Sequence, residues 1–67
     1  MTIKEIRLKK NMTLEIASKK IGIGPTHLHY IETGKREPSF SVINNMVKVY
    51  KVTPTTIFEA LNQLKVN

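Results

Sequence analysis

The sequence has 67 residues, no cysteine and a formal charge of +6, from 11 lysines and arginines against 5 glutamates. We expect a chain of this length to fold as one domain, residues 1–67, whose core is too thin for the deep pocket that most enzymes need. The lack of cysteine excludes disulfides and thiolate metal sites, which is usual for proteins of a reducing cytoplasm. No apolar run approaches the roughly 18 residues that span a membrane, and the first residues do not form a signal peptide, so we expect a cytoplasmic protein that is not an enzyme.

Capping residues predict the first two helices. Thr2, followed three residues later by Glu5, forms a capping box and predicts a helix from residue 3 to about residue 10. Thr13 caps a second helix, with Glu15 in its positively polarised first turn. The apolar residues of this second helix fall on one stripe: Leu14, Ala17 and Ile21.

A glycine-rich turn separates the second helix from the third. Gly22 suits a left-handed position at a helix end, Gly24 can act as the next N-cap, and Pro25 fits the first helical position, where no N–H is needed. The third helix is predicted over residues 25–33 and ends at Gly34. It buries Leu28 and Ile31. Its other face carries polar and aromatic side chains at helical spacing: Thr26, His29, Tyr30 and Thr33.

Two further helices complete an all-α chain, because no β-type alternation persists for more than a few residues. Ser39 caps a fourth helix that extends to about Tyr50. Two apolar stripes on this helix predict a central place in the core; they are Phe40, Ile43, Val47 and Tyr50, and Val42, Met46 and Val49. Thr53, with Pro54 after it, opens a fifth helix over residues 54–65. Its apolar residues are Ile57, Phe58, Leu61 and Leu64, of which Phe58 is expected to anchor the helix to the core.

Basic residues are concentrated in the first half of the chain. Residues 1–36 carry eight basic and three acidic side chains, a net charge of +5, whereas residues 37–67 carry three basic and two acidic, a net charge of +1. Such an excess is expected if that half faces a polyanion, and it is equally expected of a basic surface that serves solubility. Charge alone leaves both interpretations open.

Two short helices joined by a tight glycine turn, the second with a polar exposed face, form the pattern of a DNA-binding helix-turn-helix over residues 13–33. A helix fits the major groove, where each base pair presents a distinct set of donors, acceptors and methyl groups. Paired helices at this spacing are common in all-α proteins, so only the identity of individual residues can show whether this pair is of the DNA-binding type.

Those residues resemble the phage repressor and Cro-type family, also called the XRE family. The similar segments are Met12-Thr13-Leu14-Glu15, Ile21-Gly22-Ile23 and Leu28-His29-Tyr30-Ile31-Glu32-Thr33-Gly34-Lys35-Arg36-Glu37-Pro38-Ser39, and the match extends over roughly residues 3–60. The resemblance implies a compact five-helix, lambda-repressor-like domain that binds double-stranded DNA.

The resemblance also implies roles for individual residues. The base-reading positions of the third helix are occupied by Pro25, Thr26, His29 and Tyr30. The positions that contact the DNA backbone are occupied by Thr13, His27, Thr33, Lys35 and Arg36. Arg7 and Glu32 match an ion pair that links the first helix to the end of the third. The chain departs from the family at Leu14, where a phosphate-binding glutamine is common, and at Pro25, which offers only apolar contact to DNA.

The sequence predicts neither a metal nor a cofactor. His27 and His29 are two residues apart on a helix and point in different directions, and no cysteine or aspartate is present to complete a metal site. Gly22 and Gly24 do not form a nucleotide-binding loop, because no strand precedes them and the third glycine of that motif is missing.

We therefore expect a transcriptional repressor that binds a palindromic operator as a homodimer, without a small-molecule ligand, on the nucleoid of a bacterial or phage-infected cell. The dimer contacts are assigned to the apolar end of the chain: Phe58, Leu61, Leu64 and Val66. Additional core packing is an equally good interpretation for the last three. The alternative function is an antitoxin or anti-repressor that uses the same scaffold to bind a protein partner.

Overall fold

A side-chain cap or a proline marks the start of each helix in the computed structural model, which describes residues 1–65. The hydroxyl oxygens of Thr2, Thr13, Ser39 and Thr53 each accept a hydrogen bond from the backbone N–H three residues later, at 3.1 to 3.2 Å. These bonds satisfy donors that a helix N-terminus otherwise leaves unpaired. The described elements are α1 (Ile3–Lys9), α2 (Leu14–Ile21), α3 (Pro25–Thr33), α4 (Phe40–Tyr50), α5 (Pro54–Asn62) and the 3₁₀ turn η1 (Gln63–Lys65).

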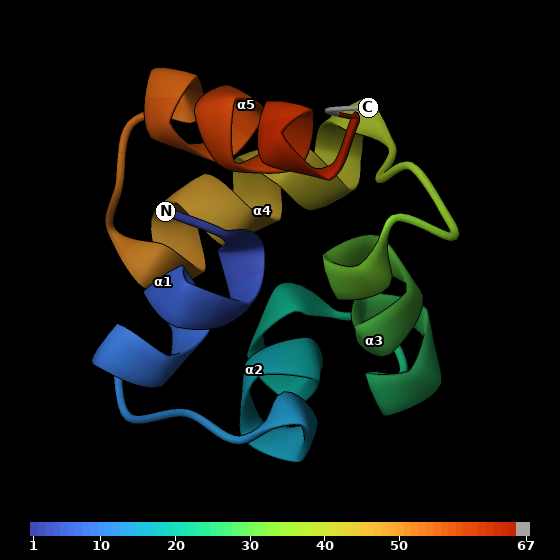
Figure 1. Ribbon diagram of the computed structural model, residues 1–67. Coiled ribbons are helices and arrows are strands. Elements are labelled where there is room, and N and C mark those ends of the chain that lie inside the picture. Colours follow the sequence, from blue (N-terminus) through green and yellow to red (C-terminus); the bar gives the residue numbers. More distant parts are fainter. Residues whose placement is uncertain (66–67) are drawn as a thin grey trace.

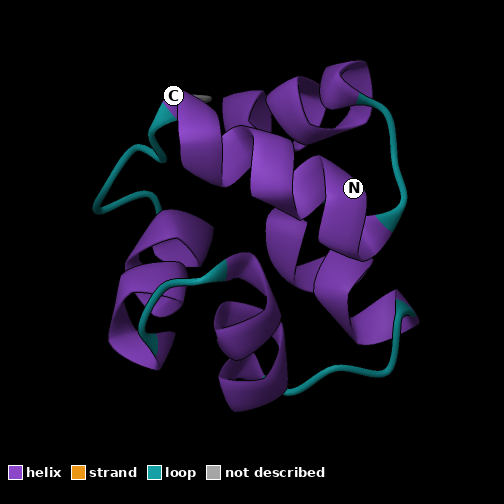
Figure 2. Ribbon diagram, turned by 180° about the vertical axis from the view of Figure 1, so that it is seen from behind, coloured by secondary structure: helices purple, strands orange, loops and turns teal. Residues whose placement is uncertain are grey.

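The helices are arranged so that α2 and α3 lie side by side in one part of the molecule and α4 and α5 in the other (Figure 1). The view from behind shows the same division (Figure 2). Helix α1 packs against α5, and α2 also contacts α4. Residues 1–65 contain no β-strand, so the predicted all-α class is confirmed.

The core is formed where the apolar sides of all five α-helices meet. Leu28 and Ile31 of α3 are completely buried against it, as the helical spacing predicts. Its apolar members are Ile3, Ile6, Ala17, Ile21, Leu28, Ile31, Val42, Ile43, Met46, Tyr50, Ile57 and Ala60. Because the underside of α3 is anchored in this core, the opposite face of α3 is held outward at a fixed orientation.

Two polar side chains reinforce the packing around α2. Asn45 of α4 donates from Nδ2 to the carbonyl oxygen of Ile21 at 3.0 Å, which satisfies one of the free carbonyls at the end of α2. The buried hydroxyl of Ser18 donates to the carbonyl oxygen of Glu15 at 3.1 Å. Ser18 therefore occupies the interior of the helix pair without leaving its hydroxyl unpaired.

Three details differ from the sequence-based expectations. The α-helical part of α5 ends at Asn62, and the backbone continues as 3₁₀ through Lys65. Phe40 is 74% exposed, because it is the first residue of α4 and the buried residues of this helix begin only at Val42. Phe58 is 46% exposed, because Ile57 and Ala60 occupy the buried side of α5 and turn Phe58 outward. The predictions that Phe40 joins a core stripe and that Phe58 anchors α5 to the core are therefore wrong.

Candidate nucleic-acid interface

The turn between α2 and α3 is short and fixed by its backbone. Gly22 adopts a left-handed conformation with φ 96°, and the N–H groups of Gly22 and Ile23 both donate to the carbonyl oxygen of Ser18, at 2.8 and 3.0 Å. A left-handed residue is costly for any side chain with a Cβ, so glycine suits this position. Gly24 then returns to an extended conformation and Pro25 begins α3. The two helices are thereby held at one relative orientation.

Helix α3 presents a polar and aromatic surface, which we call the reading face: Thr26, His29, Tyr30 and Thr33. All four side chains are exposed, and Pro25 at the start of the helix is exposed as well. His27 lies toward the flank of the helix and is half-buried. The opposite side of α3 is buried in the core, so only this one face is available to a ligand as large as DNA.

The N-terminal end of α2 lies beside the reading face. A shallow hollow joins the two and is lined by Leu14, Glu15, Pro25, Thr26 and His29. Thr13, the exposed N-cap of α2, uses its hydroxyl oxygen to accept from Ile16 N at 3.1 Å, so its hydroxyl hydrogen remains available for donation. The unpaired N–H groups and the positive end of the helix dipole favour an anion at this position, whereas the carboxylate of Glu15 opposes one.

The loop that follows α3 carries two exposed cations. Gly34 has φ 84°, and this left-handed turn directs the chain back along α3. The N–H groups of Lys35 and Arg36 donate to the carbonyl oxygen of Tyr30 at 2.9 and 3.2 Å. The ammonium of Lys35 lies 5.4 Å from the centre of the Tyr30 ring. Residues 34–38 are called the basic loop here, and its first three residues are therefore fixed to the last turns of α3.

Arg7 and Glu32 form an ion pair that is removed from solvent. Arg7 Nε donates to Glu32 Oε2 at 2.7 Å and Nη2 donates to Oε1 at 3.2 Å, while Nη1 donates to the carbonyl oxygen of Met12 at 2.9 Å. Their side chains are only 6% and 4% exposed. The hydrogen bonds that Arg7 donates to Glu32 raise the pKa of Arg7 above its usual range, against the opposing effect of burial. The pair joins α1 to the last turn of α3 and so supports the reading face from behind.

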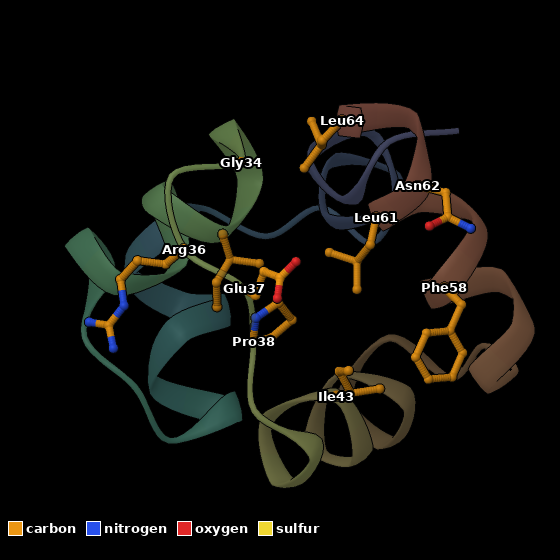
Figure 3. A pocket seen from close by; sticks show the side chains of 10 residues that line it. Gly34, Arg36, Glu37, Pro38, Ile43, Phe58, Leu61, Asn62 and Leu64 are labelled. Atoms are coloured by element: carbon orange, nitrogen blue, oxygen red, sulfur yellow. The ribbon is translucent and has the colours of Figure 1, made fainter. Parts of the chain in front are cut away.

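The residues assigned to a dimer lie around a second hollow, of about 210 Å³, between the basic loop, α4 and α5 (Figure 3). Its apolar lining is Ile31, Pro38, Ile43, Phe58, Leu61 and Leu64. Leu61 and Leu64 are half-buried, and Leu64 lies close to Gly34. The guanidinium of Arg36 points away from this hollow. Val66 lies outside the described residues.

Sequence reasoning missed the exposure of Phe40, which is the most exposed of the large apolar side chains. Phe40 lies one helical turn before Ile43, a residue that lines the hollow, so both fall on the same side of α4. Its exposure could have been predicted from its position, because Phe40 directly follows the N-cap Ser39 and a side chain at the first position of a helix often projects past the end of the core. Within residues 1–65, no three side chains of the metal-ligating types gather, and no helix is long and apolar enough to cross a membrane.

Comparison with known proteins assigns the chain to a family. The sequence model of a family described as Helix-turn-helix matches residues 3–57, which include α2, the glycine turn and α3. A protein of Archaeoglobus fulgidus, named as an uncharacterized HTH-type transcriptional regulator, is 34% identical over 56 residues, which are 84% of this chain and 79% of that protein. Together with the buried underside and polar outer face of α3, these matches show that the chain belongs to the XRE-type helix-turn-helix family of DNA-binding transcription regulators.

Proposed function

We propose that the protein is a repressor that reads a palindromic operator with α3 and binds it as a homodimer. The observation that carries this proposal is the continuity of the reading face with the basic loop, because Tyr30 of α3 contacts both Lys35 and Arg36. A surface of this kind offers side chains to base edges in the major groove and cations to the phosphates beside it.

Base reading is assigned to the exposed residues that start and line α3: Pro25, Thr26, His29 and Tyr30. Thr26, His29 and the Tyr30 hydroxyl supply hydrogen bonds to base edges, and Pro25 supplies apolar contact such as that with a thymine methyl. Contact with the DNA backbone is assigned to the residues that flank this face: Thr13, His27, Thr33, Lys35 and Arg36. Backbone contacts fix the register of the helix but carry no sequence information directly.

The homodimer is assigned to the hollow beside α5 and the apolar side chains around it. Phe40 and Phe58 are exposed on α4 and α5, and Leu61 and Leu64 line the hollow between these helices and the basic loop. Grouped exposed apolar side chains are typical of an interaction surface. Because this surface adjoins the basic loop rather than the reading face, a partner bound here leaves α3 free to enter DNA.

Repression follows from occupancy. A dimer seated on its operator within a promoter excludes polymerase from the same DNA, and it needs no effector site to do so. The level of free protein, or competition for the operator, would then set the degree of repression.

Selection of bound sequences from a random duplex library tests the proposal. We expect a palindromic consensus whose half-sites are one helical turn apart, about 34 Å between centres. A consensus without two-fold symmetry would contradict the homodimer. Binding without any consensus, together with a stable complex with another protein, would contradict operator recognition and favour an antitoxin or anti-repressor on the same scaffold.

A further inference from the structure

The side chain of Lys35 is placed against Tyr30 by the turn at Gly34. In a continued helix, Lys35 would lie about 140° around the axis from Tyr30 and would point away from it. The left-handed Gly34, with φ 84°, instead brings Lys35 back over the ring, where its ammonium is 5.4 Å from the ring centre. The ring also lies 6.2 Å from that of His29, centre to centre.

The backbone around this contact leaves little freedom to either residue. The carbonyl oxygen of Tyr30 accepts from Lys35 N at 2.9 Å, from Arg36 N at 3.2 Å and from the Thr33 hydroxyl at 3.3 Å. The starting points of both side chains are therefore fixed relative to each other. What remains free is the rotation of an exposed tyrosine side chain, which has two common staggered positions about its first torsion in a helix.

We propose that Lys35 contributes to the sequence specificity of this protein by holding the Tyr30 ring in the orientation that reads a base. The inference rests on the proposed reading role of α3. An ammonium over an aromatic face favours the one ring position that keeps this contact. The ammonium has three N–H donors, and those that point away from the ring can bind a phosphate at the same time. A Lys35 that binds a phosphate in this way also fixes where the Tyr30 ring lies relative to the bases.

This role differs measurably from simple phosphate binding. A residue that only neutralises phosphate weakens binding to every sequence alike. A residue that orients Tyr30 changes the ratio between the affinity for the selected operator and the affinity for random DNA. Contacts of this kind at exposed sites correspond to a factor of about 2 to 5 in an equilibrium constant.

The test compares the parent protein with Lys35→Met, Lys35→Arg, Tyr30→Leu and the double variant Lys35→Met/Tyr30→Leu. The side chains of Lys35 and Tyr30 are exposed, so we expect these variants to keep the fold. We expect Lys35→Met to lower the ratio of operator affinity to random-DNA affinity about 2- to 5-fold. The separate variant Lys35→Arg should keep the parental ratio, because a guanidinium also stacks on an aromatic face. In the Tyr30→Leu background, Lys35→Met should leave the ratio unchanged. Arg36→Met is the matched control and should weaken both affinities by the same factor.

A second readout needs no DNA. The side-chain protons of Lys35 above the ring should show upfield NMR shifts in the parent that disappear in Tyr30→Leu. If the shifts are absent from the parent, Lys35 does not hold the ring, and the proposal fails while DNA recognition by α3 stands. If the shifts are present but Lys35→Met weakens operator and random DNA equally, Lys35 acts on phosphate alone and the proposal is overturned. If Tyr30→Leu leaves the selected consensus unchanged, the reading role of Tyr30 fails and the proposal fails with it.

Discussion

At the scale of single residues, the most consequential feature is a pair of charges placed inside a small domain. Arg7 and Glu32 are almost fully removed from water, yet each charged group keeps hydrogen-bond partners. Such a pair adds little net stability compared with an apolar pair of the same volume, but removing one partner leaves an uncompensated buried group. Because the Glu32 carboxylate raises the pKa of Arg7, its guanidinium stays charged through the whole neutral and moderately alkaline range, and its contribution to stability is lost only at extremely alkaline pH.

We predict that Arg7→Met lowers the free energy of unfolding by about 3–5 kcal/mol, as measured by urea unfolding at pH 7. The double variant Arg7→Met/Glu32→Leu should recover most of the loss, because both buried charges are then gone. Lys9→Met, which removes an exposed cation from the same helix, is the control. A loss below about 1 kcal/mol for Arg7→Met, the value typical of exposed pairs, would contradict the buried role.

Tyr50 gives a second prediction at this scale. Its side chain is completely buried, and its hydroxyl has no hydrogen-bond partner among residues 1–65. Burial, assisted by the nearby Glu32 carboxylate and opposed by Arg7, raises the pKa of Tyr50 to about 12. In the unfolded chain tyrosine releases its proton near pH 10, so between these two values the folded state holds more protons than the unfolded state. The stability must therefore fall as the pH rises through this window.

The measurement is the free energy of unfolding between pH 9 and pH 12 for the parent and for Tyr50→Phe. The parent should lose stability on the order of 2 kcal/mol through this group, and Tyr50→Phe should lack that part of the loss. At pH 7 the variant should be at least as stable as the parent, because it removes a buried hydroxyl without a partner. Tyr30→Phe retains Tyr50 and should keep the parental loss. Parallel pH curves for the parent and Tyr50→Phe would show that the interpretation is wrong.

At the scale of helices and turns, the two glycines that flank α3 have different conformational demands. Gly34 is left-handed, with φ 84°, whereas Gly24 is extended and has nothing within 4 Å of the place where a Cβ would lie. At Gly34 a Cβ would meet Leu64 Cβ at 3.5 Å, an ordinary contact. Any cost of a side chain at Gly34 must therefore come from the backbone conformation and not from a clash.

We predict opposite effects for the same substitution at these two positions. Gly34→Ser should lower the free energy of unfolding by about 1–2 kcal/mol, the cost of a left-handed residue with a Cβ. Gly24→Ser should raise it by about 0.5–1 kcal/mol, because serine is a good N-cap and restricts the unfolded chain. Thermal unfolding of the two variants beside the parent measures both effects. A stabilising Gly34→Ser would show that the left-handed turn is not required.

Some features of the helices could be predicted from the sequence and others could not. Every helix start was predictable, because a cap residue or a proline acts through neighbours within a few positions. The outward face of α3 was predictable from helical spacing. How far Phe40 and Phe58 are exposed was not predictable, because it depends on how α4 and α5 pack against each other and on where the core ends. The bond from Asn45 to Ile21 was equally hidden, because it joins residues 24 positions apart.

At the scale of the whole molecule, size and symmetry decide how DNA can be recognised. One recognition helix reads too few base pairs to distinguish an operator from the many competing sites of a genome. Two-fold symmetry doubles the site, and it requires two copies whose recognition helices are about 34 Å apart. The molecule measures 30 × 23 × 22 Å, so two copies in direct contact reach a separation of this order. The spacing is therefore compatible with direct contact between the copies.

We predict that the surface around Phe40 and Phe58 forms the contact between the two copies of the proposed homodimer. Phe40 and Phe58 are 74% and 46% exposed, so their replacement by serine costs the folded monomer little, whereas Leu61 is half-buried and packs against the core. We expect Phe40→Ser/Phe58→Ser to remain folded by circular dichroism, to bind an isolated half-site with parental affinity, and to lose cooperative binding to the full palindrome. Leu8→Ser removes an apolar side chain that is 52% exposed on α1, and it should leave cooperativity intact. Titration of half-site and palindrome, with sedimentation equilibrium of the free proteins, separates the two effects. If the double variant keeps its cooperativity, the contact between the two copies must lie on another surface, and Phe40 and Phe58 do not take part in it.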